Sequence, residues 1–159
     1  MMVWRNGFMP IPKLTSDGEL IPGVHEATLK ELEDEFGLSS PRRIILMDGL
    51  KAAVANFKSA RVSSIYIDGS FTTNKLEPND IDGCWSALGN VDLSKLDTVF
   101  WDAQTTNERR SNLQKMKATY GLDFYIAEGT ETGSGLKFPD FFQQNKNGKK
   151  KGIIKINIR

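Results

Sequence analysis

The stretch from Ile67 to Gly83, IDGSFTTNKLEPNDIDG, contains the pattern from which the fold and the site are interpreted. An apolar, β-branched segment ends at Gly69-Ser70, and the chain then returns to Asp80 and Asp82, which are separated by one residue. Side chains alternate between the two faces of a strand. If the second segment is a strand, both aspartates project to one side, where their charges repel unless a cation or a proton lies between them.

This arrangement is typical of a metal-dependent phosphoryl- or nucleotidyl-transfer site. Mg²⁺ prefers carboxylate oxygens together with substrate phosphates, and two such ions can stabilise both the attacking and the leaving oxygen of an in-line displacement. Gly69 allows the backbone to approach a ligand closely, the Ser70 hydroxyl and nearby amides can donate to a phosphate, and Lys75 can neutralise phosphate charge. The alternative is a loop in which Asp80 and Asp82 are surface acids that cap a strand.

The composition indicates an ordinary globular chain. Its 159 residues, 39% hydrophobic and 26% charged, favour one domain with a sizeable core. The single cysteine, Cys84, permits no internal disulfide and no cysteine-rich zinc site, and a reducing cytoplasm is the default. No apolar run approaches the roughly 20 residues of a membrane span, and the first ten residues lack the apolar core of a signal peptide. We therefore expect a cytoplasmic protein with no membrane partner.

Charge is unevenly distributed along the chain. The net charge of +1 gives no global signature of nucleic-acid binding. Acidic residues gather between Asp17 and Glu35, whereas the segment from Asn145 to Arg159 is basic and contains no acid. We interpret these segments as a solvated helix and a solubilising tail. The alternative is that Lys149–Lys151 binds a nucleic-acid backbone.

Helix and strand patterns alternate along the sequence. The residues up to about Gly23 are rich in Pro and Gly and predict an extended N-terminal arm, residues 1–23. Apolar residues at helical spacing and β-branched runs predict the elements that follow. The expected helices are 24–36, 41–59 and 105–120, and the expected strands are 62–68, 80–86, 122–127 and 152–159, with a short one at 98–101. This order predicts one α/β (α+β) domain over residues 1–159, a mixed sheet flanked by helices.

The order Gly69-Ser70, about ten residues, then Asp80-Ile81-Asp82 resembles the signature of the nucleotidyltransferase superfamily with the DNA polymerase beta fold. The wider pattern is most similar to the DUF6932-type nucleotidyltransferase-like proteins of bacteria and phages. Three segments support that similarity: a GxHxAT-like start at 23–28, a YIDGSFxTxKxxPxDID core at 66–82, and an FFQxxxxGxxKGI end at 141–153. The resemblance therefore spans most of the chain.

The resemblance implies a single nucleotidyltransferase-like domain with Mg²⁺ or Mn²⁺ as its cofactor. Asp80 and Asp82 would be catalytic metal ligands, and a third carboxylate on a later strand would complete the site. The resemblance points to Asp123 for that role, while Asp97 and Asp102 compete with it. Gly69, Ser70 and Lys75 would bind the nucleotide.

The implied reaction moves a nucleoside monophosphate from a nucleoside triphosphate to a hydroxyl acceptor and releases pyrophosphate. The acceptor stays open between RNA, a protein hydroxyl and a small molecule. The segment after Ser70 is short and contains Pro78, so the helix that often follows this turn in the superfamily should be brief or missing. The alternative function is a catalytically weak binding module that acts with a protein partner, for instance in a toxin–antitoxin or phage-defence system.

Four further residues have ordinary structural interpretations. His25 should be a helix-start residue or a packing residue. Cys84 falls on the face of Asp80 and Asp82 by parity and should be buried. Arg109 and Arg110 begin a helix and should face solvent, unless one reaches a triphosphate. GxxxxGK[ST], HExxH and CxxC motifs are absent, which argues against an ATPase, a zinc protease and a thiol oxidoreductase.

Overall fold

The computed structural model of the chain describes residues 11–158. Five strands form one mixed sheet in the order β1-β5-β2-β3-β4. Their bounds are β1 Gly23–Ala27, β2 Ser64–Asp68, β3 Ile81–Trp85, β4 Leu122–Ile126 and β5 Gly152–Asn157. β2 is antiparallel to both of its neighbours, whereas β1 is parallel to β5 and β3 is parallel to β4. The predicted α/β architecture, a mixed sheet flanked by helices, is confirmed.

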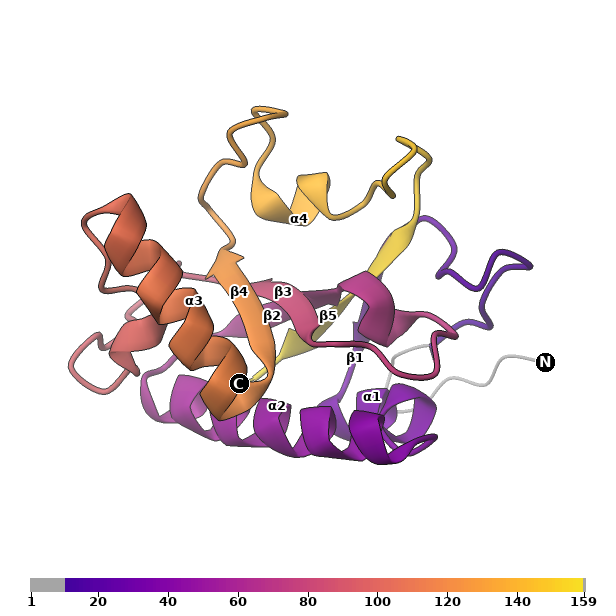
Figure 1. The fold of residues 1–159 in the computed structure, drawn as a ribbon, viewed down its shortest axis with the longest axis horizontal. Helices are drawn as coiled ribbons and strands as arrows, with labels where there is room; N and C mark the ends of the chain where they lie inside the picture. Colours follow the sequence, from indigo (N-terminus) through magenta and orange to yellow (C-terminus); the bar gives the residue numbers. More distant parts are fainter. Residues whose placement is uncertain (1–10, 159) are drawn as a thin grey trace.

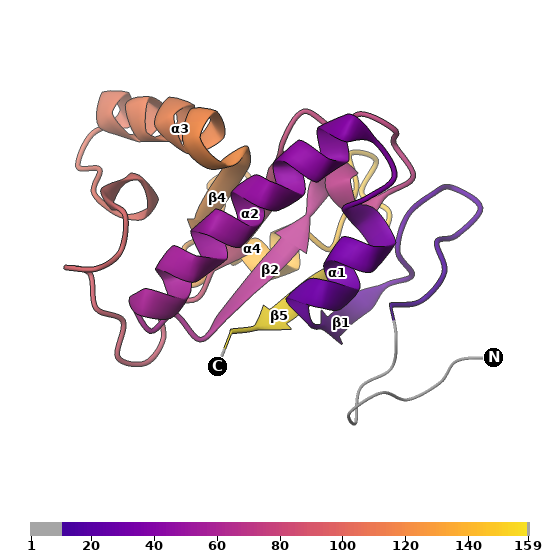
Figure 2. The same cartoon turned by 90° about the horizontal axis from the view of Figure 1, so that it is seen from below.

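The helices are distributed unequally over the two faces of the sheet (Figures 1 and 2). Their bounds are α1 Leu29–Phe36, α2 Pro41–Ser59, α3 Thr106–Tyr120 and α4 Phe138–Phe141, with 3₁₀ turns η1 Gly69–Thr72 and η2 Thr98–Phe100. α1 and α2 cover one face, and α3 packs beside β4 and against α2. Within residues 11–158, the opposite face carries the short α4 and its flanking loops.

Local capping chemistry sets the ends of the long helices. The Ser40 side chain accepts a backbone N–H in the first turn of α2. Thr105 and Glu108 form a capping box at the start of α3, and Gly121, with a left-handed φ of 70°, ends it. These signals are short in range, which is why the sequence predicts the ends of both helices closely.

Two predicted elements are wrong in type. Residues 24–27, expected as the start of a helix, form β1, because this segment pairs in parallel with β5, where His25 lies opposite Ile154. Residues 98–101, expected as a short strand, contain η2, in which the Asp97 carboxylate caps the turn by accepting the Val99 N–H. The one-turn helix α4 was not predicted.

The two faces of the sheet have separate apolar clusters. The larger cluster lies between the sheet and α1, α2 and α3, where Phe57 packs against Trp85, Phe100 and Phe124 at centroid distances of 6.3, 4.7 and 6.0 Å. The smaller one lies on the α4 face and contains Cys84, Ala127, Phe142 and Ile153. Cys84 is fully buried, as its position in the sequence predicts, and burial raises the pKa of its thiol.

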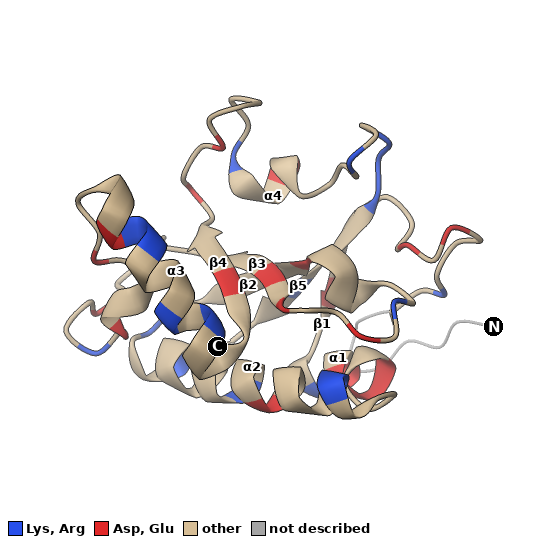
Figure 3. Ribbon diagram, viewed as in Figure 1, with Lys and Arg blue, Asp and Glu red and all other residues tan. Residues whose placement is uncertain are grey.

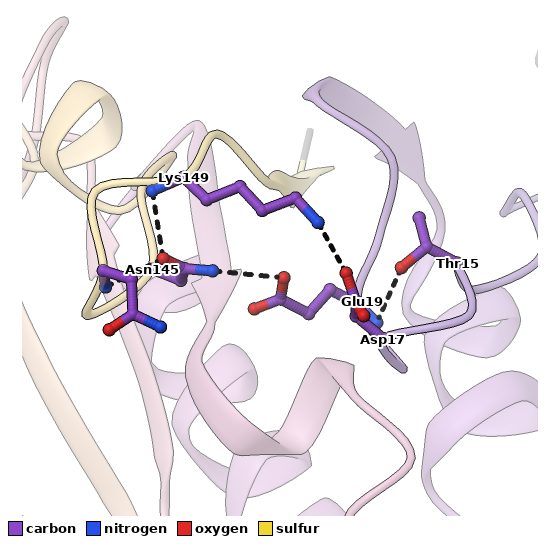
Figure 4. Close-up of polar contacts among 6 residues, drawn as sticks. Thr15, Asp17, Glu19, Asn145 and Lys149 are labelled. Carbon is purple, nitrogen blue, oxygen red and sulfur yellow. Dashed lines mark hydrogen bonds and ion pairs between the residues drawn. The ribbon is translucent and has the colours of Figure 1, made fainter.

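The N-terminal segment contacts the loop that precedes β5. Residues 11–22 form neither helix nor strand, and residues 1–10 of the predicted arm lie outside the described residues. Lys149 pairs with Asp17, and the Asn145 amide lies 3.4 Å from the Glu19 carboxylate (Figure 4). The Gly152 N–H donates to the Leu20 carbonyl at 3.0 Å. These contacts join the segment to the start of β5.

No helix among residues 11–158 combines the length and the apolar character that crossing a membrane requires.

Candidate metal centre

Three aspartates lie next to one another across the sheet on the α4 face. Strand register places Asp68 of β2 opposite Asp82 of β3, and Asp82 opposite Asp123 of β4. Asp80 lies just before β3. Figure 3 shows the acidic positions of β3 and β4 side by side, with basic residues along α3. Adjacent strands therefore concentrate negative charge at one point of the sheet.

Asp80, Asp82 and Asp123 form a compact carboxylate cluster. Each offers one oxygen, and these three oxygens lie within 4.8 Å of one another. The two competing candidates lie elsewhere: Asp97 accepts a hydrogen bond from the Tyr120 hydroxyl at 2.6 Å, and Asp102 is exposed. Of the three acids considered from the sequence, Asp123 is the one that joins Asp80 and Asp82.

The cluster is electrostatically strained. Burial, together with the charges of Asp80, Asp123 and Asp68, raises the pKa of Asp82 to about 7, and Lys117 opposes that rise. Burial also raises the pKa of Asp123, against the pull of Lys117 and Arg109.

One oxygen of the cluster has no partner. Asp123 Oδ1 is buried, and no described residue forms a hydrogen bond with it. A buried carboxylate oxygen without a partner is costly, and a divalent cation both pairs such an oxygen and removes the repulsion between the carboxylates. The residues present therefore fit a hard divalent metal ion.

Gly69 allows the turn after β2 to lie directly against Asp82. Its φ of 78° is in the left-handed region, and a Cβ atom built there would overlap the Asp82 carboxylate. Ser70 follows it in η1, which is one short turn, so the helix after the Gly-Ser turn is brief, as predicted. Only glycine fits this position without moving the acid.

A buried arginine on α2 holds the loop that follows Gly69. Arg43 is 2% exposed, and its guanidinium donates to backbone carbonyls. Its acceptors are the carbonyls of Phe36, Ser70, Phe71, Thr73 and Lys75. Burial lowers the pKa of Arg43. The Lys75 side chain is exposed and does not line the pocket at the acids, so its nucleotide-binding role stays a prediction.

A pocket of about 450 Å³ opens at the acids, on the α4 face. Asp82 and Asp123 lie in its wall, together with aromatic side chains and the polar residues of the loop before α4. The remaining lining residues are Tyr125, Thr130, Glu131, Thr132, Phe138, Phe141 and Phe142. The pocket thus combines two of the three acids with an aromatic surface.

A family model described as a family of unknown function, DUF6932, matches residues 12–157. The chain belongs to this family. No curated protein and no solved structure matches it. The DUF6932 match contains every residue of the candidate site, and the family's description names no activity, so the carboxylate cluster is the feature of this DUF6932 protein from which a function has to be inferred.

Asp68 and Lys151 belong to the surroundings of the site, although no sequence pattern predicted that they pair. They form an ion pair in which their side chains are 8% and 12% exposed, and Asp68 contributes to the raised pKa of Asp82. The prediction that Lys149–Lys151 is a solvated run is therefore wrong for Lys151. The burial of Lys151 could have been predicted from the sequence, because residues two apart along a strand face the same side of the sheet. Lys151 lies two residues before Ile153, which belongs to the apolar cluster of the α4 face.

Two cations of α3 also lie near the acids. Lys117 pairs with Asp80 at 3.4 Å. The prediction that Arg109 faces solvent is wrong: its guanidinium lies 4.5 Å from the centre of the Tyr125 ring and donates to the Phe124 carbonyl at 3.2 Å. Arg110 is exposed, as predicted. The inward position of Arg109 could have been predicted from the sequence. Leu113, Met116 and Tyr120 form one face of the helix, and extending that face by one turn toward the N-terminus reaches residue 109.

Proposed function

We propose that this DUF6932 protein is a metal-dependent nucleotidyltransferase, which moves a nucleoside monophosphate from a nucleoside triphosphate to a hydroxyl acceptor. The observation that carries the proposal is the close cluster of Asp80, Asp82 and Asp123 beside the Gly69-Ser70 turn. The similarity of residues 66–82 to the nucleotidyltransferase signature supports the same activity.

Each residue of the site has a role in this proposal. Asp80, Asp82 and Asp123 hold Mg²⁺ or Mn²⁺, which when bound neutralises phosphate charge and polarises the phosphoryl group. Ser70 and the amides of its turn bind phosphate oxygens, since consecutive backbone N–H groups in a turn form an anion site. Lys75 supplies a further positive charge to the triphosphate.

The reaction balances without a covalent enzyme intermediate. The acceptor oxygen forms a bond to the α-phosphorus, the bond from that phosphorus to the bridging oxygen breaks, and pyrophosphate leaves. The proton of the acceptor hydroxyl passes to a carboxylate. Asp123 is placed to receive it, because it lines the pocket at the acids.

Calorimetric titration with each of the four nucleoside triphosphates in Mg²⁺ tests the donor site. We expect the wild-type protein to bind at least one of them only when Mg²⁺ is present. Asp80→Asn/Asp82→Asn should abolish that binding, and Asp102→Asn, an exposed acid outside the cluster, should leave it unchanged. Metal-independent binding, or binding that survives the double substitution, would contradict the proposal.

A binding module with little or no catalysis, acting with a protein partner as in toxin–antitoxin or phage-defence systems, is the second candidate. Its support is that lysines already neutralise two acids: Lys117 pairs with Asp80, and Lys151 pairs with Asp68. The same titration separates the two candidates. If the folded wild-type protein binds no triphosphate in Mg²⁺, the enzyme proposal fails and the binding module remains.

A further inference from the structure

A second pocket lies beside the pocket at the acids. It has a volume of about 250 Å³ and is lined by residues of η2, α3, β4 and the loop before α4. Tyr125, Thr130 and Phe138 line both pockets. The Tyr125 and Phe138 rings are stacked, with centroids 4.4 Å apart and planes 18° from parallel. This aromatic pair therefore lies at the boundary between the two pockets.

The charged group of the second pocket is the Arg109 guanidinium. It lies over the Tyr125 ring and donates to the Phe124 carbonyl. Within residues 11–158, no Asp or Glu forms an ion pair with it within 4.0 Å. A guanidinium offers five N–H donors in a planar fork that matches phosphate and carboxylate oxygens. Arg109 therefore retains donors for a ligand.

Arg43 shows what a purely structural arginine looks like in this chain. Arg43 is almost fully buried, and its three nitrogens donate to five backbone carbonyls. Arg109 has one such acceptor, is half-buried and lines a cavity. The comparison indicates that Arg109 is placed for recognition and not for holding a loop.

The other residues that line the second pocket indicate which further groups a ligand should have. Phe100, Trp101 and Phe138 present aromatic surface, and Asn112 and Thr130 add polar groups. A volume of about 250 Å³ lies just below the usual range of ligand pockets, roughly 300–1,000 Å³, so the site fits one ring with a small substituent. The N-terminal amides of α3 are not the anion site, because the Thr105 and Glu108 capping box engages that end of the helix.

We infer that the second pocket binds a small molecule or group in which a planar ring carries an oxyanion, a phosphate or a carboxylate. The oxyanion pairs with Arg109, and the ring lies among the aromatic walls. Since this pocket adjoins the acids across the Tyr125–Phe138 pair, an occupant that also carries a hydroxyl group is the acceptor of the transfer reaction. That last assignment rests on the proposed function, whereas the binding site itself does not.

Titration of the full-length protein with phenyl phosphate and with benzoate, in EDTA and without nucleotide, tests the site. We expect saturable binding of at least one probe. Binding is measured from the changes in the chemical shifts of Arg109 and Tyr125 in NMR spectra. The stronger probe distinguishes phosphate from carboxylate recognition. Phenol, which has the ring without the charge, should bind at least about tenfold more weakly, a loss of about 1.4 kcal/mol.

Substitutions separate a recognition role of Arg109 from a structural one. Arg109→Gln should weaken binding of the charged probe at least about tenfold, and Arg109→Lys should restore part of it. Arg110→Gln, at the exposed neighbouring position, should leave probe binding unchanged. Unfolding curves of each variant show that the fold is retained.

Two results would overturn the inference: absence of saturable binding of both probes to the wild-type protein, or equal binding by wild type and a folded Arg109→Gln variant. These results are independent of the donor-site titration, which requires Mg²⁺ and the acids. If the protein binds a probe but no triphosphate, the proposed reaction and the assignment of the acceptor are therefore contradicted. The inference that the second pocket is a binding site still holds. If both ligands bind, competition between phenyl phosphate and the triphosphate would contradict two separate pockets.

Discussion

Asp82 is the residue of the site whose pKa is raised by burial and by Asp80, Asp123 and Asp68. It lies between Asp68 and Asp123 across the sheet, contacts the Gly69 turn, and has Asp80 two residues before it. Its raised pKa, about 7, means that the metal-free protein holds a proton there over a pH range in which the unfolded chain does not. Protonation and metal binding are therefore alternative ways of relieving the same repulsion.

The proton on Asp82 should make the free energy of unfolding depend on pH. Between the ordinary value of 3.8 and about 7, the folded state binds more protons at Asp82 than the unfolded state does, so this residue lowers the free energy of unfolding as pH rises through that window. Urea unfolding of the metal-free protein across the window measures it. In Asp82→Asn the fall should be smaller, and parallel curves for the two proteins would contradict the assignment.

The pair of Asp68 and Lys151 is a second prediction at this scale. Lys151→Met leaves a carboxylate buried without its partner, which should cost about 3–5 kcal/mol of unfolding free energy. Adding Asp68→Asn should recover part of that loss. Urea unfolding of both single variants and the double variant gives the coupling energy. Lys150→Met, at an exposed position, is the matched control, and additive losses in the cycle would show that the pair is not coupled.

The conformation of the loop after β2 depends on α2, a helix that is distant from it in the sequence. Residues 70–75 contain only the short turn η1, yet Arg43 of α2 binds four of their carbonyls, and its guanidinium lies 5.2 Å from the centre of the Phe71 ring. Ser40, the cap of α2, also donates to the Leu76 carbonyl at 2.9 Å. The position of the Gly69-Ser70 turn therefore depends on the N-terminal end of α2.

Arg43→Leu should loosen this loop in particular. Two buried and three partly buried carbonyls lose their donor, so the free energy of unfolding should fall by about 3 kcal/mol or more. Hydrogen exchange at the amides of residues 70–75 should accelerate more than exchange in β2. The exposed Arg110→Leu serves as control. Unchanged exchange in the loop would show that Arg43 does not determine its conformation.

The whole molecule is held together by aromatic packing on the helix-covered face. Phe57 of α2 contacts Trp85 of β3, Phe100 of η2 and Phe124 of β4, so one side chain joins four elements. Trp85 also donates its indole N–H to the Phe100 carbonyl at 3.3 Å. Because β3 and β4 also carry Asp82 and Asp123, this cluster supports the strands on which the acids lie.

Phe57→Ala should destabilise the entire domain. Removing a fully buried ring costs about 3–5 kcal/mol, a large part of the roughly 5–15 kcal/mol that stabilises a typical domain. Ile45→Ala, at an exposed position of the same helix, should change stability by less than about 0.5 kcal/mol. Urea unfolding followed by circular dichroism measures both. A Phe57→Ala variant within about 1 kcal/mol of wild type would contradict this role.

Features with local causes were predictable from the sequence. Strand alternation pointed to Asp80 and Asp82, and the resemblance to the nucleotidyltransferase superfamily pointed to Asp123; the structure brings these three acids together. Capping residues marked the ends of α2 and α3. The strand β1 was missed because its apolar pattern is short and merges with that of α1, so only pairing with β5 distinguishes it. The roles of Ser70, Lys75 and the acids in nucleotide transfer stay predictions.

The sequence by itself determined the mixed α/β class and the acid motif, because the order of helices and strands and the spacing of the acids are read from local patterns. It also determined the membership of the DUF6932 family, because the similarity extends over residues 12–157. Only the tertiary structure decided which cations reach the acids. Lys151 meets Asp68 across 83 residues because β5 lies beside β2, and Lys117 and Arg109 reach the site because α3 packs beside β4. Strand order and register set such contacts, and the periodicity of one segment contains no information about the segment that pairs with it.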